Sequence, residues 1–301
     1  MDLKDIKKIG IIGAGTMGSG IAQVFAEAGF YVYLFDETYK KAEEGKRKVI
    51  KRLQKALEKQ CDKNGYANIT TISNMQSILL NIVPIELRDM KSINEIPQLF
   101  IEAVFEDLKT KQTVFRELDD LCDPQTILAT NTSSISISEI AKAVSDARKE
   151  KIIGAHFMNP PYILKLLEIV RSDCTSDETY KLIFELAQKL KRDPILTSMD
   201  VPGFIVNANL MPSLRQSLIC LENNIASIED INRSIMLGVG GAMGPLDLGD
   251  LIGWDIVLNI LNQLYKYYGE YKPPQLLHHL VREGYLGKKT KKGIFDFYGK
   301  E

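Results

Sequence analysis

The segment Gly13-Ala14-Gly15-Thr16-Met17-Gly18 is the feature that most constrains the fold of this chain. An apolar run at 9–12 precedes it, an amphipathic stretch at 17–28 follows it, and a second apolar run at 31–35 ends at Asp36. This order of strand, glycine-rich turn, helix and strand is typical of a dinucleotide-binding unit, because the glycines permit a tight turn and a close approach to a pyrophosphate. Amide groups at the start of the helix would hold the phosphates. The predicted cofactor contacts are Gly13, Gly15, Thr16, Met17 and Gly18.

Asp36 indicates which dinucleotide such a turn accepts. A carboxylate at the end of the second strand can accept hydrogen bonds from the adenosine ribose, and its charge repels a 2′-phosphate. NAD is therefore the predicted cofactor, in preference to NADP. A flavin site and a plain tight turn are the alternatives.

Short apolar runs alternate with amphipathic stretches through the N-terminal two thirds of the chain. Strands are expected at 82–85, 99–104, 126–130, 151–155 and 166–170, with helices at 107–121, 136–147 and 177–191. This alternation predicts an α/β fold with a Rossmann-type, mainly parallel sheet that is covered on both faces. Pro84 cannot donate to a neighbouring strand, so its run is expected at an edge.

Two segments depart from the alternation. Residues 38–80 are predicted to form a helical arm, in which Lys48, Lys51, Arg52 and Lys55 share one face of a helix at 46–57 and apolar side chains cover the other. Beyond about residue 200 the apolar residues follow helical spacing. We therefore expect an NAD-binding domain at 1–200 and an all-α C-terminal domain at 201–301.

Composition excludes several classes of protein. The 301 residues include 38 basic and 39 acidic ones, a net charge of −1, which argues against nucleic acid as the main partner. Because no apolar run reaches 18 residues, no membrane partner is expected. The four cysteines form no CxxC pair, so we predict neither a disulfide scaffold nor a metal site. A reducing cytoplasm is the simplest location.

His156 is one of only three histidines and ends the predicted strand at 151–155. Glu168 interrupts the apolar run at 166–170, where an unpaired carboxylate would be costly to bury. The turn-forming residues Asn159-Pro160-Pro161 allow the chain to double back between the two. We predict a pair in which Glu168 orients the His156 imidazole as a general base. The alternative for His156 is a purely structural role.

Polar residues also follow the strand at 126–130. Like His156, the hydroxyl groups of the segment 130–134 are expected to face the ligand crevice at the carboxyl ends of the strands, where they can bond a substrate oxygen. The alternative is that Ser or Asn only caps the next helix. Asn207, one turn into the first helix of the second domain, is similarly ambiguous.

Together these residues resemble the 3-hydroxyacyl-CoA dehydrogenase family, which includes 3-hydroxybutyryl-CoA dehydrogenases, over essentially the whole chain. The most specific segments are 156–160 and 165–170; the segments 101–107, 131–134, 202–207 and 243–248 also match. The resemblance implies interconversion of an (S)-3-hydroxyacyl-CoA and a 3-ketoacyl-CoA with NAD, with short acyl chains expected. It further implies a substrate cleft and a homodimer contact formed by the helical domain.

The resemblance also assigns site residues. It implies that His156 is the general acid/base with Glu168 as its partner, and that Ser133 and Asn207 bond the substrate. The residues that would line the NAD site are Glu106, Lys111, Asn159 and Lys289. Ser133, Arg52 and Lys59 would contact CoA, although the family tends to have Ser where Arg52 stands.

Three alternatives remain open at this point. The basic face of the arm is either a solvated surface or a site for CoA phosphates. A dehydrogenase of another hydroxy acid, such as a sugar acid, has a similar architecture, but a basic face favours CoA. A non-catalytic NAD-binding protein of the same fold is the third alternative, against which the presence of His156 and Glu168 argues.

Overall fold

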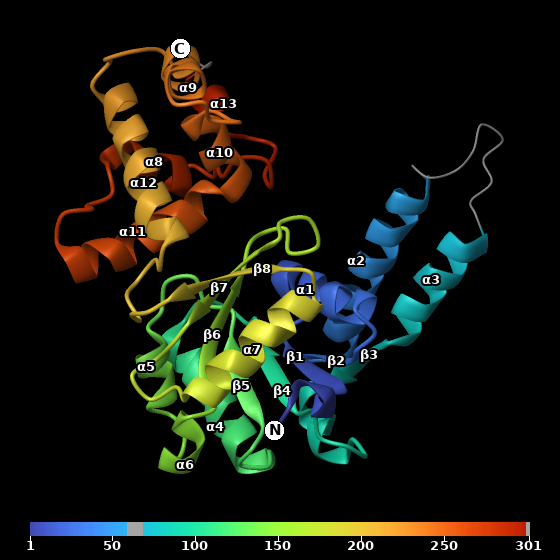
Figure 1. Ribbon diagram of the computed structural model, residues 1–301. Helices are drawn as coiled ribbons and strands as arrows, with labels where there is room; N and C mark the ends of the chain where they lie inside the picture. The colour runs from blue at the N-terminus through green and yellow to red at the C-terminus, as the bar shows by residue number, and fades with distance from the viewer. Residues whose placement is uncertain (59–68, 299–301) are drawn as a thin grey trace. The chain divides into compact units, whose positions relative to one another are not determined.

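The structure is a computed structural model that describes residues 1–58 and 69–298 (Figure 1). The chain divides into two compact units, Met1–Asp200 and Val201–Glu301.

The first unit is built on one eight-stranded sheet with the strand order β3-β2-β1-β4-β5-β6-β7-β8. All neighbouring strands are parallel except β6 and β7, so the predicted mainly parallel sheet is confirmed. The strands are β1 (Lys8–Ile12), β2 (Tyr31–Asp36), β3 (Ile82–Glu86), β4 (Leu99–Glu102), β5 (Ile127–Thr130), β6 (Ile152–Phe157), β7 (Leu166–Val170) and β8 (Asp193–Thr197).

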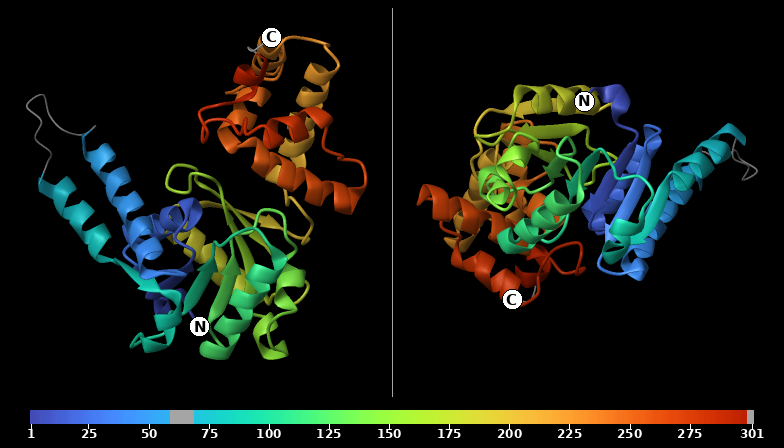
Figure 2. Two further views of the ribbon diagram at one scale, coloured as in Figure 1. Left: turned by 180° about the vertical axis from the view of Figure 1, so that it is seen from behind. Right: turned by 90° about the horizontal axis from the view of Figure 1, so that it is seen from below.

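Helices cover both faces of this sheet, as the alternating pattern predicts (Figures 1 and 2). On one face, α1 (Thr16–Glu27) and α7 (Asp177–Lys189) share a core with strand residues such as Ile11, Ala155 and Leu167. On the other face lie α4 (Leu108–Leu121), α5 (Ile137–Ala141) and α6 (Asp146–Lys149). Short 3₁₀ helices form η1 (Leu3–Asp5) and η2 (Leu87–Ser92).

The structure confirms one sequence prediction about these elements, corrects another and adds a strand. Pro84 lies in β3, which is an edge strand as expected, because it pairs only with β2. The single helix predicted at 136–147 is wrong in detail, since α5 and α6 are separate. The edge strand β8 was not predicted: Pro194 and an alternation of exposed and half-buried residues hide it, and an edge position tolerates that proline.

The arm consists of α2 (Tyr39–Glu58) and α3 (Ile69–Leu80), which contact each other beside β3 (Figure 2). The predicted helix at 46–57 is present but begins earlier, at Tyr39. The predicted CoA contact Lys59 and the predicted turn at Asn64-Gly65 lie outside the described residues.

The second unit is helical, as predicted, with a core around the buried Trp254. Its helices are α8 (Val206–Glu222), α9 (Ile228–Gly238), α10 (Pro245–Ile252), α11 (Trp254–Tyr268), α12 (Gln275–Arg282) and α13 (Ile294–Tyr298). Ser227 caps α9, its side chain accepting a hydrogen bond from the amide of Asp230. Within residues 1–58 and 69–298, every helix is too short or too polar to cross a membrane.

The turn between β1 and α1 depends on two different properties of glycine. Gly13 has a φ of +97°, which L residues with a side chain rarely adopt. Gly18 has an ordinary place in the helix, but a Cβ there would lie 1.7 Å from the carbonyl oxygen of Gly13. Gly15 has a φ of −65°, and a Cβ added to it would meet nothing within 4 Å. The backbone is therefore crowded at Gly18 and open at Gly15.

This contrast yields a paired prediction. Gly18→Ala forces the start of α1 away from the turn, so we expect the free energy of unfolding to fall by about 1–3 kcal/mol. Gly15→Ala introduces no clash, and we expect a change of less than about 1 kcal/mol. Urea denaturation of the two variants and the unchanged protein measures both values. Equal stability of the two variants would contradict this account of the turn.

Candidate active site

The structure brings His156 and Glu168 together through the antiparallel pairing of β6 and β7. The two residues lie directly opposite each other in the ladder, and Nδ1 of His156 is 2.7 Å from Oε2 of Glu168. Glu168 is completely buried and His156 is 7% exposed. A carboxylate in such a place needs a donor, and the imidazole supplies it.

The acceptor character of the carboxylate assigns the imidazole tautomer. An ionised Glu168 can only accept, so the hydrogen bond places the ring proton on Nδ1 of His156. In the neutral ring, Nε2 then carries the lone pair and can take a proton from a ligand. This is the arrangement that a general base requires.

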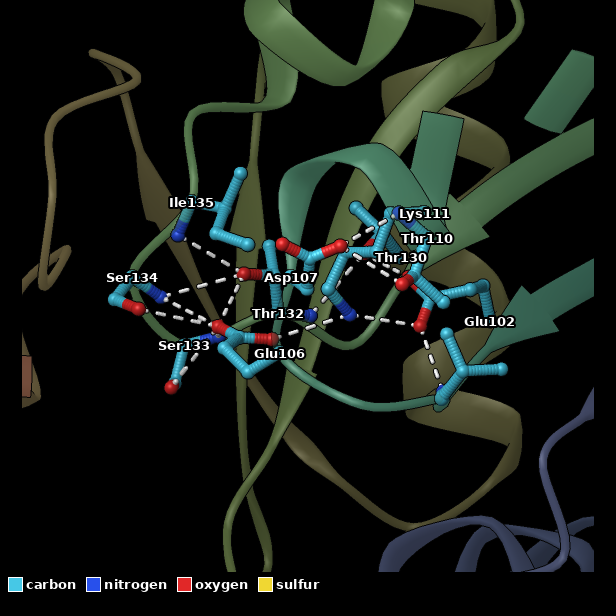
Figure 3. Close-up of polar contacts among 11 residues, drawn as sticks. Glu102, Glu106, Asp107, Thr110, Lys111, Thr130, Thr132, Ser133, Ser134 and Ile135 are labelled. Carbon is cyan, nitrogen blue, oxygen red and sulfur yellow. Dashed lines mark hydrogen bonds and ion pairs between the residues drawn. The ribbon is translucent and has the colours of Figure 1, made fainter. Parts of the chain in front are cut away.

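The segment that follows β5 is organised around the carboxylate of Glu106 (Figure 3). Its Oε1 accepts hydrogen bonds from the Thr132 hydroxyl at 2.6 Å, the Ser133 amide at 2.9 Å and the Ser134 amide at 3.2 Å. The hydroxyls of Ser133 and Ser134 lie 3.4 Å and 3.1 Å from the same oxygen. Glu106 thus holds the backbone of Ser133 and Ser134 in place.

Lys111 of α4 lies between two carboxylates. Its Nζ is 2.7 Å from Oε1 of Glu102 and 3.1 Å from Oε2 of Glu106. Lys111 is 1% exposed and Glu102 is fully buried, so these charges compensate each other away from water. Burial alone lowers the pKa of Lys111, but the two carboxylates outweigh burial and raise it. Burial alone raises the pKa of Glu106, but Lys111 and the donors from Thr132 and Ser133 lower it overall.

Glu102 is a member of this network that sequence analysis missed. Its Oε1 also accepts from the Val104 amide at 2.7 Å, and its Oε2 accepts from the Thr130 hydroxyl at 2.7 Å. A signal was present in the sequence, because Glu102 ends an apolar strand just as Asp36 does. The partner Lys111 could not be inferred, since only the packing of α4 brings it there.

Asn131 contacts β6, the strand that carries His156, whereas Asn159 lies in the loop that follows it. The side-chain oxygen of Asn131 accepts a hydrogen bond from the Phe157 amide at 2.9 Å, which ties the end of β5 to β6. Asn159 is exposed in the loop between β6 and β7, and its peptide bond to Pro160 is cis.

The residues of the glycine-rich turn fit NAD. Thr16 and Met17 form the first turn of α1, no side chain caps that end of the helix, and the space around Gly15 is open to a pyrophosphate. Asp36 is held at the end of β2, where Oδ2 accepts from the Ala14 amide at 2.7 Å. A ribose at this edge would therefore meet a fixed carboxylate.

The arm shows only part of its predicted basic face to solvent. Lys48, Lys51 and Lys55 are exposed. Arg52 instead turns toward α1, where its guanidinium donates to the backbone oxygen of Ser19 at 2.9 Å and lies 4.7 Å from the centroid of the Tyr162 ring. Burial lowers the pKa of Arg52. Its guanidinium therefore anchors the arm to the body of the first unit.

Two predicted site residues lie in the second unit. Asn207 is buried in the first turn of α8. Lys289 forms an ion pair with both carboxylate oxygens of Asp255. Gly253, with a φ of +104°, leaves room for that lysine, because a Cβ there would lie 3.3 Å from its Nζ.

Comparison with known proteins finds matches to one family in both units. The family profile for the 3-hydroxyacyl-CoA dehydrogenase NAD binding domain matches residues 8–201, and the profile for the C-terminal domain matches residues 203–297. A 3-hydroxybutyryl-CoA dehydrogenase of Clostridioides difficile is 40% identical, covering 96% of this chain and 99% of the relative. The human mitochondrial hydroxyacyl-coenzyme A dehydrogenase is 34% identical, covering 97% and 91%.

Among solved structures, one with a similar fold covers nearly the whole chain. The crystal structure of (S)-3-hydroxybutyryl-CoA dehydrogenase PaaH1 from Ralstonia eutropha is 33% identical, with a TM-score of 0.84 over 96% of this chain and 98% of that one. The first unit is thus an NAD-binding domain, and the second is the C-terminal domain that accompanies it. The chain belongs to the 3-hydroxyacyl-CoA dehydrogenase family.

Proposed function

We propose that this NAD-dependent oxidoreductase interconverts short-chain (S)-3-hydroxyacyl-CoA and 3-ketoacyl-CoA, with 3-hydroxybutyryl-CoA and acetoacetyl-CoA as the pair. The observation that carries the proposal is the buried hydrogen bond of 2.7 Å between His156 and Glu168 in a chain of this family. The names of relatives at up to 40% identity support the substrate class.

In the oxidative direction, the substrate hydroxyl gives its proton to Nε2 of His156 as the carbonyl forms. Glu168 stabilises the imidazolium that results, and in the reductive direction the same nitrogen returns the proton. Bound NAD supplies the hydride acceptor. The Ser133 hydroxyl, on the backbone held by Glu106, orients the reacting oxygen, and Asn207 of the second unit is proposed as a further donor.

Cofactor contacts are proposed for the glycine-rich turn, Asp36 and Asn159, with Lys289 from the second unit. Glu106 and Lys111 belong to the same proposed site. For CoA we propose contacts from Ser133 and Lys59 and from the exposed lysines of the arm. The inward direction of Arg52 supports a role in holding the arm rather than a direct phosphate contact.

A homodimer formed through the helical unit is also proposed. Ile225, Leu237 and Val239 of this unit are 67%, 77% and 72% exposed, and large exposed apolar side chains of this kind are typical of protein interfaces. The cytoplasm remains the proposed location.

The first test concerns the acid/base pair. A general base contributes about 10²–10⁴-fold to rate, so we expect His156→Gln to lower kcat by about that factor. Glu168→Gln should also lower kcat, because an amide does not stabilise an imidazolium as a carboxylate does. Residues that act as a unit lose activity non-additively, so the double variant should be little worse than His156→Gln alone.

Turnover of acetoacetyl-CoA, followed by NADH absorbance, measures this cycle. His278→Gln is the matched control, because His278 is an exposed histidine of α12. This variant should turn over acetoacetyl-CoA at the rate of the unchanged protein. Near-normal turnover by His156→Gln would contradict the role of His156 as the base. Fully additive losses of kcat would mean that His156 and Glu168 do not act as a unit.

The second test concerns cofactor selectivity. Asp36→Asn keeps an oxygen that can accept from the Ala14 amide but removes the charge that repels a 2′-phosphate. We expect the ratio of kcat/KM for NADPH to that for NADH to rise about tenfold or more, the effect of about 1.4 kcal/mol. Equal use of both cofactors by the unchanged protein would contradict this role of Asp36.

The third test concerns the arm. Replacing Lys51 and Lys55 by Gln removes two exposed charges, which should raise KM for acetoacetyl-CoA by about two- to thirtyfold. KM for a truncated thioester without the nucleotide should be unaffected. Added salt should reduce the difference in KM for acetoacetyl-CoA between the variant and the unchanged protein. Lys181→Gln on α7 is the control, since Lys181 is also exposed but lies on another helix. Equal losses with both thioesters would mean that this face does not bind CoA phosphates.

A further inference from the structure

The buried Glu102 is fixed by more contacts than a simple ion pair needs. Its two oxygens take the Val104 amide, the Thr130 hydroxyl and the Lys111 ammonium, each at 2.7 Å. These partners come from the segment just after β4, from the last residue of β5 and from α4 respectively. Glu102 thus sets where Lys111 lies relative to the two strand ends (Figure 3).

Glu106 divides its two oxygens between different partners. Its Oε2 faces Lys111 at 3.1 Å, and its Oε1 accepts from Thr132, Ser133 and Ser134. If Glu106 were the only carboxylate beside Lys111, both of its oxygens would be drawn to the ammonium, because a buried cation without sufficient opposite charge is costly. Glu102 shares this task and leaves Oε1 of Glu106 to the segment after β5.

We propose that Glu102 is a positioning residue for Ser133, acting through Lys111 and Glu106. The Glu102 carboxylate pairs with Lys111, so Glu106 needs only Oε2 for its own contact with that ammonium. Oε1 of Glu106 then accepts from the Ser133 amide and holds that backbone in place. This proposal rests on the proposed function, in which the Ser133 hydroxyl orients the reacting oxygen.

The first arm of the test measures the loop without any catalysis. Glu102→Gln keeps the shape but removes the charge, so Glu106 moves toward Lys111 and the amides of Ser133 and Ser134 lose the hydrogen bonds to Oε1 of Glu106. Hydrogen exchange followed by mass spectrometry should show about tenfold or faster exchange in the peptide covering 131–136. Glu102→Asp keeps the charge and should exchange more slowly than Glu102→Gln. An unchanged rate in Glu102→Gln overturns the proposal, and this result does not depend on which substrate the enzyme takes.

The second arm is a double-mutant cycle with Ser133→Ala on kcat for acetoacetyl-CoA and NADH. We expect Glu102→Gln to lower kcat about tenfold or more in the unchanged background and less than about threefold when Ser133 is already Ala. Asp119→Asn is the matched control, because it disrupts the ion pair with the buried Arg148 in the same unit, at 2.9 Å, and its effect should add to that of Ser133→Ala. Additive losses for Glu102→Gln overturn the proposal.

If Glu102→Gln does not fold, the cycle is run with Glu102→Asp. Its smaller loss of kcat should likewise vanish in the Ser133→Ala background, and a loss that persists there overturns the proposal. Failure of the unchanged protein to reduce acetoacetyl-CoA would refute the proposed function, and the exchange measurement would still decide the role of Glu102.

Discussion

The hydrogen bond between His156 and Glu168 depends on the single antiparallel step in an otherwise parallel sheet. Parallel neighbours need a long crossover, usually through a helix, whereas an antiparallel partner can return after a short loop. The loop between β6 and β7 therefore brings residues 12 positions apart directly opposite each other. Because β6 and β7 both have a neighbouring strand on each side, the pair is buried as well as aligned. The antiparallel pairing thus supplies the partner, and the internal position of both strands supplies the burial.

The parallel strands give the rest of the site its common edge. β2 ends at Asp36, β4 at Glu102 and β5 at Thr130, and strands that run the same way end on the same side. Buried charge at such an edge is costly unless an opposite charge and hydrogen bonds compensate it. Glu102 and Glu106 share Lys111, and the hydroxyls and amides after β5 complete the bonding of Glu106. The polar groups of the site are therefore held by each other as much as by the sheet.

Sequence patterns predicted the features that are local. The glycine-rich turn, the edge position of Pro84 and the helical second unit follow from backbone limits and side-chain periodicity, and each is present in the structure. Features that depend on tertiary contacts were less accessible. The sharing of Lys111 between two carboxylates requires the packing of α4, and the inward turn of Arg52 requires Ser19 and Tyr162 beside it. Helical periodicity alone predicted Arg52 to lie on the basic face of the arm.

The position of the ring proton on His156 decides whether this residue can act as the base. The chain has three histidines, so ¹⁵N labelling of histidine and comparison with His156→Gln assigns its ring nitrogens by NMR. We expect that in the neutral imidazole Nδ1 carries the proton and Nε2 the lone pair. This preference should weaken in Glu168→Gln, because an amide side chain does not select the donor as strongly as a carboxylate does. A ring protonated on Nε2 with Nδ1 unprotonated in the unchanged protein would contradict the account, since the base would then have no lone pair for the substrate.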